Sequence, residues 1–92
     1  MSTPADHKTA AETLIAQVTA ASNGSGLTPR SADFDIIAAH ADLARATGSG
    51  THYAAAEAEL ATASGASQSG NGDLTYTMHA RLARAHAQLA DR

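Results

Sequence analysis

The chain has 92 residues, which is the size of a single domain (1–92), and it contains no cysteine, which excludes disulfide bonds and thiolate metal sites. Its net charge of −3 argues against a general nucleic-acid binder, because neutralising phosphates requires clustered lysine and arginine side chains. No apolar run approaches the ~20 residues that cross a membrane, and no signal peptide stands out, so we expect a cytoplasmic protein without a membrane partner.

Alanine accounts for 24 residues, whereas the chain has only seven leucines, three isoleucines and one valine. Alanine has the highest helix propensity, and its small side chain lets two helix axes approach to the short end of the range of ~8–10 Å. A core of alanine with scattered leucine is thin. We therefore expect an all-α protein of modest stability, unless a partner or a homo-oligomer adds buried surface.

Two helices are predicted in the first half of the chain. The first covers 4–22, because Thr3-Pro4 supplies a cap and a first-turn proline, and a glycine-rich segment follows. The second begins either at Thr28-Pro29 or at Ser31 and runs to about residue 47, where Gly48 stops it.

The second half contains two more predicted helices. The third covers 51–63, and the serine- and glycine-rich stretch 64–72 after it is expected to be a flexible linker. The fourth begins at Asp73, which caps it, and runs to the C-terminus. Its apolar residues recur at three-and-four spacing, which predicts that they form its buried face. These residues are Leu74, Met78, Leu82, Ala85, His86 and Leu89.

The same unit of about 45 residues occurs twice. Residues 7–12 read His-Lys-Thr-Ala-Ala-Glu and residues 52–57 read His-Tyr-Ala-Ala-Ala-Glu, and the later segments 36–44 and 82–90 also match. Each unit is one supersecondary element that needs a neighbour to bury its apolar face. The sequence therefore predicts an antiparallel four-helix bundle built from two tandem αα-hairpin repeats, at about 4–48 and 49–92. Matched positions such as Ile36 and Leu82 should then lie in similar surroundings.

Segments 52–57 and 85–90 resemble a family of short alanine-rich proteins of actinobacteria and their phages. Members carry a "His-Tyr-x-x-Ala-Glu … His-Ala-x-Leu-Ala" unit, and most have no assigned function. The first copy departs from this pattern, because Lys8 stands where the second copy has Tyr53. The resemblance implies a helical hairpin and a phage or prophage source, and it brings no catalytic residues.

The five histidines are the candidates for chemistry. In antiparallel hairpins Glu12 comes roughly level with His40, and Glu57 with His79 or with the repeat-equivalent His86. The favoured interpretation of such a pair is a structural hydrogen bond, and a pH-sensitive contact or a metal site are the alternatives. The chain lacks the Glu-x-x-His motif of di-iron bundles, so we predict no resident metal or cofactor. The candidate ligands for the metal alternative are His40, His86, Glu12 and Glu57.

We predict a protein that is not an enzyme, because the chain has no Gly-x-Ser-x-Gly elbow and no phosphate-binding loop. The last helix is mildly basic on an acidic body, which is typical of a solvated face or of a contact surface for an acidic protein. Its candidate partner-binding residues are Arg81, Arg84 and His79. The leading hypothesis is a protein-interaction module, phage- or prophage-encoded, directed at a host or phage protein. A metal- or small-ligand-binding bundle is the second hypothesis, and a weak nucleic-acid binder acting through the last helix is the third.

Overall fold

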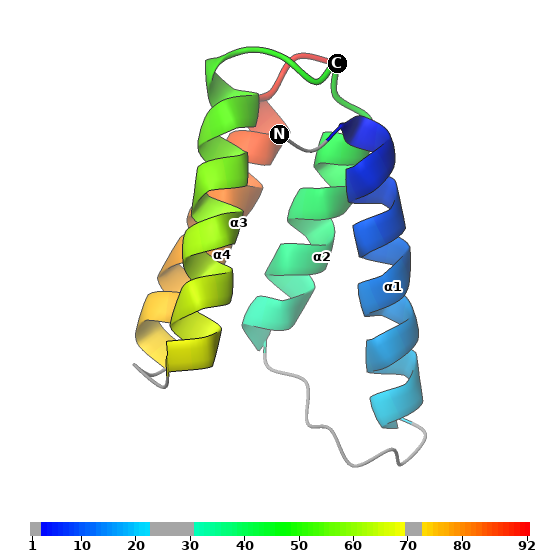
Figure 1. Cartoon of the computed structure of the whole chain (residues 1–92), viewed down its shortest axis with the longest axis vertical. Helices are drawn as coiled ribbons and strands as arrows, with labels where there is room; N and C mark the ends of the chain where they lie inside the picture. The colour runs from blue at the N-terminus through cyan, green and yellow to red at the C-terminus, as the bar shows by residue number, and fades with distance from the viewer. Residues whose placement is uncertain (1–2, 23–30, 70–72) are drawn as a thin grey trace.

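The computed structural model of the chain describes residues 3–22, 31–69 and 73–92, and these residues form four helices and no strand (Figure 1). The helices are α1 (Pro4–Ser22), α2 (Ser31–Ala44), α3 (Thr51–Ser69) and α4 (Asp73–Leu89). The prediction of an all-α, four-helix protein is confirmed. None of the helices in the described ranges is both long and apolar enough to cross a bilayer.

The helices alternate in direction, so that α2 and α4 run the same way (Figure 1). These two parallel helices nevertheless pack directly against each other, and α3 packs on α4 while α1 packs on α2. Near the starts of the two parallel helices, the Tyr76 hydroxyl donates to Asp33, and after their ends the Thr47 N–H donates to the Asp91 carbonyl at 2.8 Å. The bundle is therefore organised around the α2–α4 contact.

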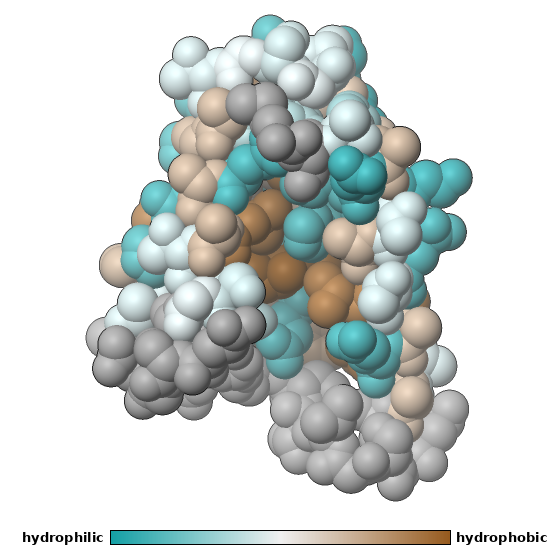
Figure 2. Space-filling view, viewed as in Figure 1, coloured by the Kyte–Doolittle hydropathy of each residue, from teal (hydrophilic) through white to brown (hydrophobic). Residues whose placement is uncertain are grey.

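Helix α1 stands apart from the second hairpin. Within the described residues the backbone of α1 closely approaches only α2. It reaches α3 through side chains such as His7, whose ring forms a T-shaped contact with the Tyr53 ring, with the ring centroids 5.6 Å apart. In the space-filling view the surface between α1 and α3 is hollowed, and apolar atoms form its floor (Figure 2). Leu14 and Val18 of α1 are accordingly only partly buried.

The helix starts follow the sequence signals. Thr3 and Asp6 form a reciprocal cap, in which each side-chain oxygen accepts from the other residue's backbone N–H, at 3.0 and 3.2 Å. The hydrogen bonds that the Asp6 carboxylate accepts, first from the Thr3 backbone and then from the Thr3 side chain, lower the pKa of Asp6. Helix α2 begins at Ser31, the second of the two predicted starts, whereas Thr28-Pro29 lies outside the described residues.

Helix α3 continues to Ser69, so the prediction that it ends at residue 63 and that a linker begins at 64 is wrong. A single glycine in a helix costs only about 1 kcal/mol relative to alanine, and helix-forming alanines stand within two residues of Gly65 on either side, at Ala63 and Ala66. The remaining residues of the predicted linker, 70–72, lie outside the described residues.

The turn between the hairpins requires glycine. Gly48 and Gly50 have φ angles of +88° and +100°, a region that L side chains rarely adopt. A Cβ atom at Gly48 would also lie 3.1 Å from Cδ of Pro4. Glycine here lets the connection to α3 pass close to the start of α1.

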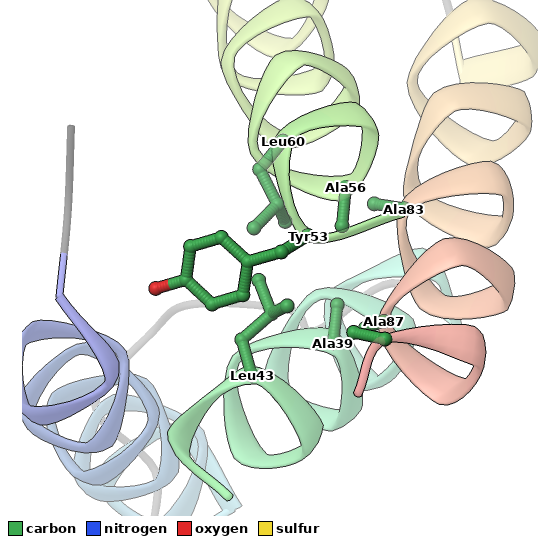
Figure 3. Packing of buried hydrophobic residues seen from close by; sticks show 8 residues of the cluster. Ala39, Leu43, Tyr53, Ala56, Leu60, Ala83 and Ala87 are labelled. Atoms are coloured by element: carbon green, nitrogen blue, oxygen red, sulfur yellow. The ribbon is translucent and has the colours of Figure 1, made fainter. Parts of the chain in front are cut away.

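The core is made mainly of alanine, with few larger side chains. Tyr53 and Leu43 are the largest fully buried side chains (Figure 3). Ile36 of α2 packs against both buried clusters and joins them. The first cluster contains Ala39, Leu43, Tyr53, Ala56, Leu60, Ala83, Ala87 and Ala90. The second contains Ala32, Ala63, Tyr76 and Ala80.

The face of α4 that the sequence predicts to be buried faces solvent instead. Met78, Leu82 and Leu89 are 49%, 42% and 62% exposed, and Ala85 is exposed as well. The alanines of the opposite face fill the core, because helices that pack at close range leave room for methyl groups and not for leucine side chains. Of the other two predicted residues, His86 is partly buried, and the side chain of Leu74 lies outside the described part.

The repeat-equivalent positions Ile36 and Leu82 consequently lie in different surroundings, since Ile36 packs on the core and Leu82 does not. The expectation that the two hairpins cover each other's apolar faces as equivalent halves is wrong. Both hairpins form, but α2 and α4 bury different faces.

The alanine core predicts how the stability of the fold responds to added side-chain volume. Replacing the fully buried Ala56 of α3 by leucine should destabilise the fold by about 1–3 kcal/mol, because the added methylenes force the helices apart. The same substitution at the exposed Ala58, two residues away on α3, should change the free energy of unfolding by less than about 0.5 kcal/mol. Urea unfolding followed by circular dichroism measures both. Equal effects at the two positions would contradict the packing described here.

Candidate functional site

Four of the five histidines meet in two pairs, and each pair joins the two helices of one hairpin. His7 of α1 faces His40 of α2 with their Nδ1 atoms 2.8 Å apart. His52 of α3 faces His86 of α4 with the same atoms 3.1 Å apart. The four residues occupy equivalent positions in the two repeats, so the duplication places the same contact twice.

The first pair is part of a larger polar group. His7 is 3% exposed, its Nε2 lies 3.4 Å from Glu57 Oε2, and its ring makes a T-shaped contact with the Tyr53 ring. The carboxylate favours a proton on His7 Nε2, so in the neutral pair His7 Nδ1 accepts and His40 Nδ1 donates.

In this arrangement His40 is neutral. Burial, and then the charge of His7, lower the pKa of His40 from 6.5 to about 4. A second proton on the pair would place two N–H groups against each other across 2.8 Å. A proton on His40 therefore works against the fold.

The predicted histidine–glutamate pairs do not form. His7 and not Glu12 is level with His40, a difference of more than one helical turn from the predicted register. Glu12 is exposed on α1 and makes no ion pair with any described residue. In the second hairpin His79 contacts Glu59, while Glu57 contacts His7 of the first hairpin.

Neither histidine pair has the geometry of two ligands on one metal. The ring centroids are 5.0 and 5.4 Å apart, close to the largest separation that the nitrogen contacts of 2.8 and 3.1 Å permit. The nitrogens thus lie nearly on the line between the rings, as in an N–H···N hydrogen bond. A metal needs about 2.0–2.1 Å to each nitrogen and does not fit between them.

The candidate ligands His40, His86, Glu12 and Glu57 are therefore not brought together. Over the described ranges, no group of three or more histidine, aspartate or glutamate side chains is arranged to hold a metal ion. The signal that sequence reasoning missed was the recurrence of a histidine near the start of each unit, at His7 and His52, with another near its end.

The candidate partner-binding residues lie on the two flanks of α4. Arg84 Nη1 lies 2.9 Å from Asp35 Oδ1, and Arg81 Nε lies 3.5 Å from Asp35 Oδ2. Two guanidinium groups on the flank of α4 that faces α2 thus pair with one buried carboxylate. On the other side His79 hydrogen-bonds to Glu59 of α3. These contacts position α4, yet the Arg81 and Arg84 side chains remain 65% and 48% exposed.

Between these flanks lies the outer stripe, which we define as Met78, Leu82, Ala85 and Leu89. The successive spacings of four, three and four residues place all four on one side of the helix. The buried residues lie on the opposite side. They are Tyr76, Ala80, Ala83, Ala87 and Ala90. Helix α4 thus has two apolar faces, and only the face with small side chains is covered by the described part of the chain.

Comparison with known proteins gives no relative: no protein-family model, no curated protein and no solved structure matches the chain. The histidine pairs and the outer stripe are therefore the features of the molecule that bear on its function.

The histidine pairs yield a prediction about pH. Because the pKa of His40 is lower in the folded than in the unfolded chain, its contribution to stability is complete above pH 6.5 and declines as the pH falls toward 4. His40 is only partly buried and solvent screens part of the effect, so we expect a loss of about 1–2 kcal/mol. Urea unfolding between pH 7.5 and 4.5 measures this loss.

The variant His40→Gln should be less stable than wild type at pH 7 and should depend less steeply on pH. Its matched control is His86→Gln in the more exposed pair, which should retain most of the wild-type slope. A His40→Gln variant with the full wild-type slope would show that other groups carry the pH dependence.

Proposed function

We propose that this chain is a non-enzymatic protein-interaction module that binds a protein partner through the outer stripe of α4. The observation that carries the proposal is the exposure of three large apolar side chains, Met78, Leu82 and Leu89, on the side of the helix opposite the core. Single exposed apolar residues are normal on protein surfaces, but several in register on one helix are typical of helix-mediated contacts.

The composition strengthens this proposal. The chain has only seven leucines, and two of them lie on the stripe while alanines fill the adjoining core. Fully burying a leucine or methionine side chain contributes about 1.5–3 kcal/mol, whereas burying a single methyl-sized group contributes about 0.8 kcal/mol. Covering the stripe would therefore bury more apolar surface per residue than the alanines do within the fold. A partner on this face would therefore add the buried surface that the thin core lacks.

The resemblance to actinobacterial and phage proteins suggests where the partner comes from, namely the host or the phage. The metal- or small-ligand hypothesis has no comparable support, because its predicted ligands do not meet. Interaction through α4 is thus the function that the described surface supports best.

The double variant Leu82→Gln/Leu89→Gln should lose the partner while keeping the fold. Both side chains are exposed, so the free energy of unfolding should change by less than about 0.5 kcal/mol. Ile15→Gln is the matched control, since Ile15 is 50% exposed but lies on α1. The measurement is affinity capture from an actinobacterial lysate at physiological salt, followed by calorimetry with the purified partner.

The proposal requires a protein that wild type and Ile15→Gln bind and that the double variant does not. Capture of no specific protein, or capture that is unchanged in the double variant, would contradict it.

A further inference from the structure

We propose that the segment that docks on the outer stripe is an acidic amphipathic helix, with apolar residues at coiled-coil spacing and aspartate or glutamate beside them. This inference rests on the proposed function and specifies the kind of partner. It follows from the spacing of the stripe, from the charges on its flanks and from what a second copy of the chain would bring to it.

The spacing points to a helix. Met78, Leu82, Ala85 and Leu89 repeat with alternating intervals of four and three, which is the a/d pattern of a coiled-coil seam. From Met78 to Leu89 the seam extends about 16 Å along the axis, or three turns. Ala85 in the middle leaves a hole between larger side chains, into which a leucine or isoleucine of the partner helix would fit as a knob.

The charges beside the seam point to an acidic partner. The positions that flank it are His79 and His86 on one side and Arg81 and Gln88 on the other, and none of them is a carboxylate. Arg81 and Arg84 share the single carboxylate of Asp35, which is itself buried. Positive charge therefore remains at this edge, and a carboxylate on the partner would lie opposite Arg81, whose side chain is 65% exposed.

The same flanks disfavour a second copy as the occupant. If two α4 helices met along their seams, Arg81 of one copy would face Arg81 or His86 of the other, depending on the direction of packing. Two arginines opposite each other repel, and neither direction of packing offers Arg81 a carboxylate, so the seam favours a different chain.

The test uses two designed helical peptides of three heptads, with leucine at every a and d position. One carries glutamate at all e and g positions and the other carries lysine there, so that charge repulsion keeps each peptide from associating with itself. Binding is measured by fluorescence anisotropy at low and physiological salt. We expect the glutamate peptide to bind at least about tenfold more tightly than the lysine peptide, with the difference shrinking as salt rises.

Three variants locate the effect. Arg81→Gln should weaken binding of the glutamate peptide severalfold while Arg84 keeps its 2.9 Å contact with Asp35. Arg45→Gln, which removes an arginine of similar exposure that pairs with Asp42, should leave binding unchanged. Leu82→Gln should abolish binding.

The other outcomes separate this inference from the proposed function. Equal binding of both peptides, lost in Leu82→Gln, would overturn the acidic chemistry and leave the stripe as a helix-docking surface. Binding of neither peptide would overturn the helical partner, while the capture experiment still decides whether the stripe binds a protein. A dimer in sedimentation equilibrium that Leu82→Gln dissociates would show that a second copy occupies the seam.

Discussion

The close contact between α2 and α4 determines the rest of this structure. Ala39 on α2 and Ala83 and Ala87 on α4 are fully buried (Figure 3), and side chains this small allow two helices to approach closely. Leucine does not fit into such a contact without forcing the helices apart. Once α4 turns its alanines toward the core, its larger apolar residues must lie on the opposite side. The exposed stripe is therefore a consequence of how the core is closed.

The same contact explains the position of α1. Two parallel helices that pack directly occupy the centre of the molecule, so α1 lies on α2 and does not reach the backbone of α3 or α4 within the described residues. The link to α3 runs through His7, which contacts Glu57 and the Tyr53 ring of α3 and hydrogen-bonds to His40 of α2. A hydrogen-bonded group of this kind fixes helix register more tightly than a contact between methyl groups, because its donors and acceptors must be matched.

Local signals in the sequence predict local structure well here. The Thr3-Pro4 start and the cap at Asp73 mark helix starts correctly, because both depend only on adjacent residues. The end of α3 was not predictable in the same way, since one glycine at position 65 weakens a helix without ending it. Periodicity also identified the apolar stripe of α4 correctly as a stripe. It did not reveal that the stripe faces away from the core, because an alanine face on the same helix fills the core with less volume.

The candidate site was partly predictable for a related reason. The duplication showed which histidines are equivalent. The register of each hairpin, however, depends on the connection between its helices and on packing. An error of about one turn in that register places Glu12 opposite His40, where the structure has His7. Equivalent residues then acquire different environments. The pair in the first hairpin is half-buried beside Glu57 and holds α1 in place, whereas the pair in the second lies closer to solvent, where His86 flanks the outer stripe. One duplicated contact thus lies in the interior of the fold in one copy and borders the exposed outer stripe in the other, because α2 and α4 present different sides to the core.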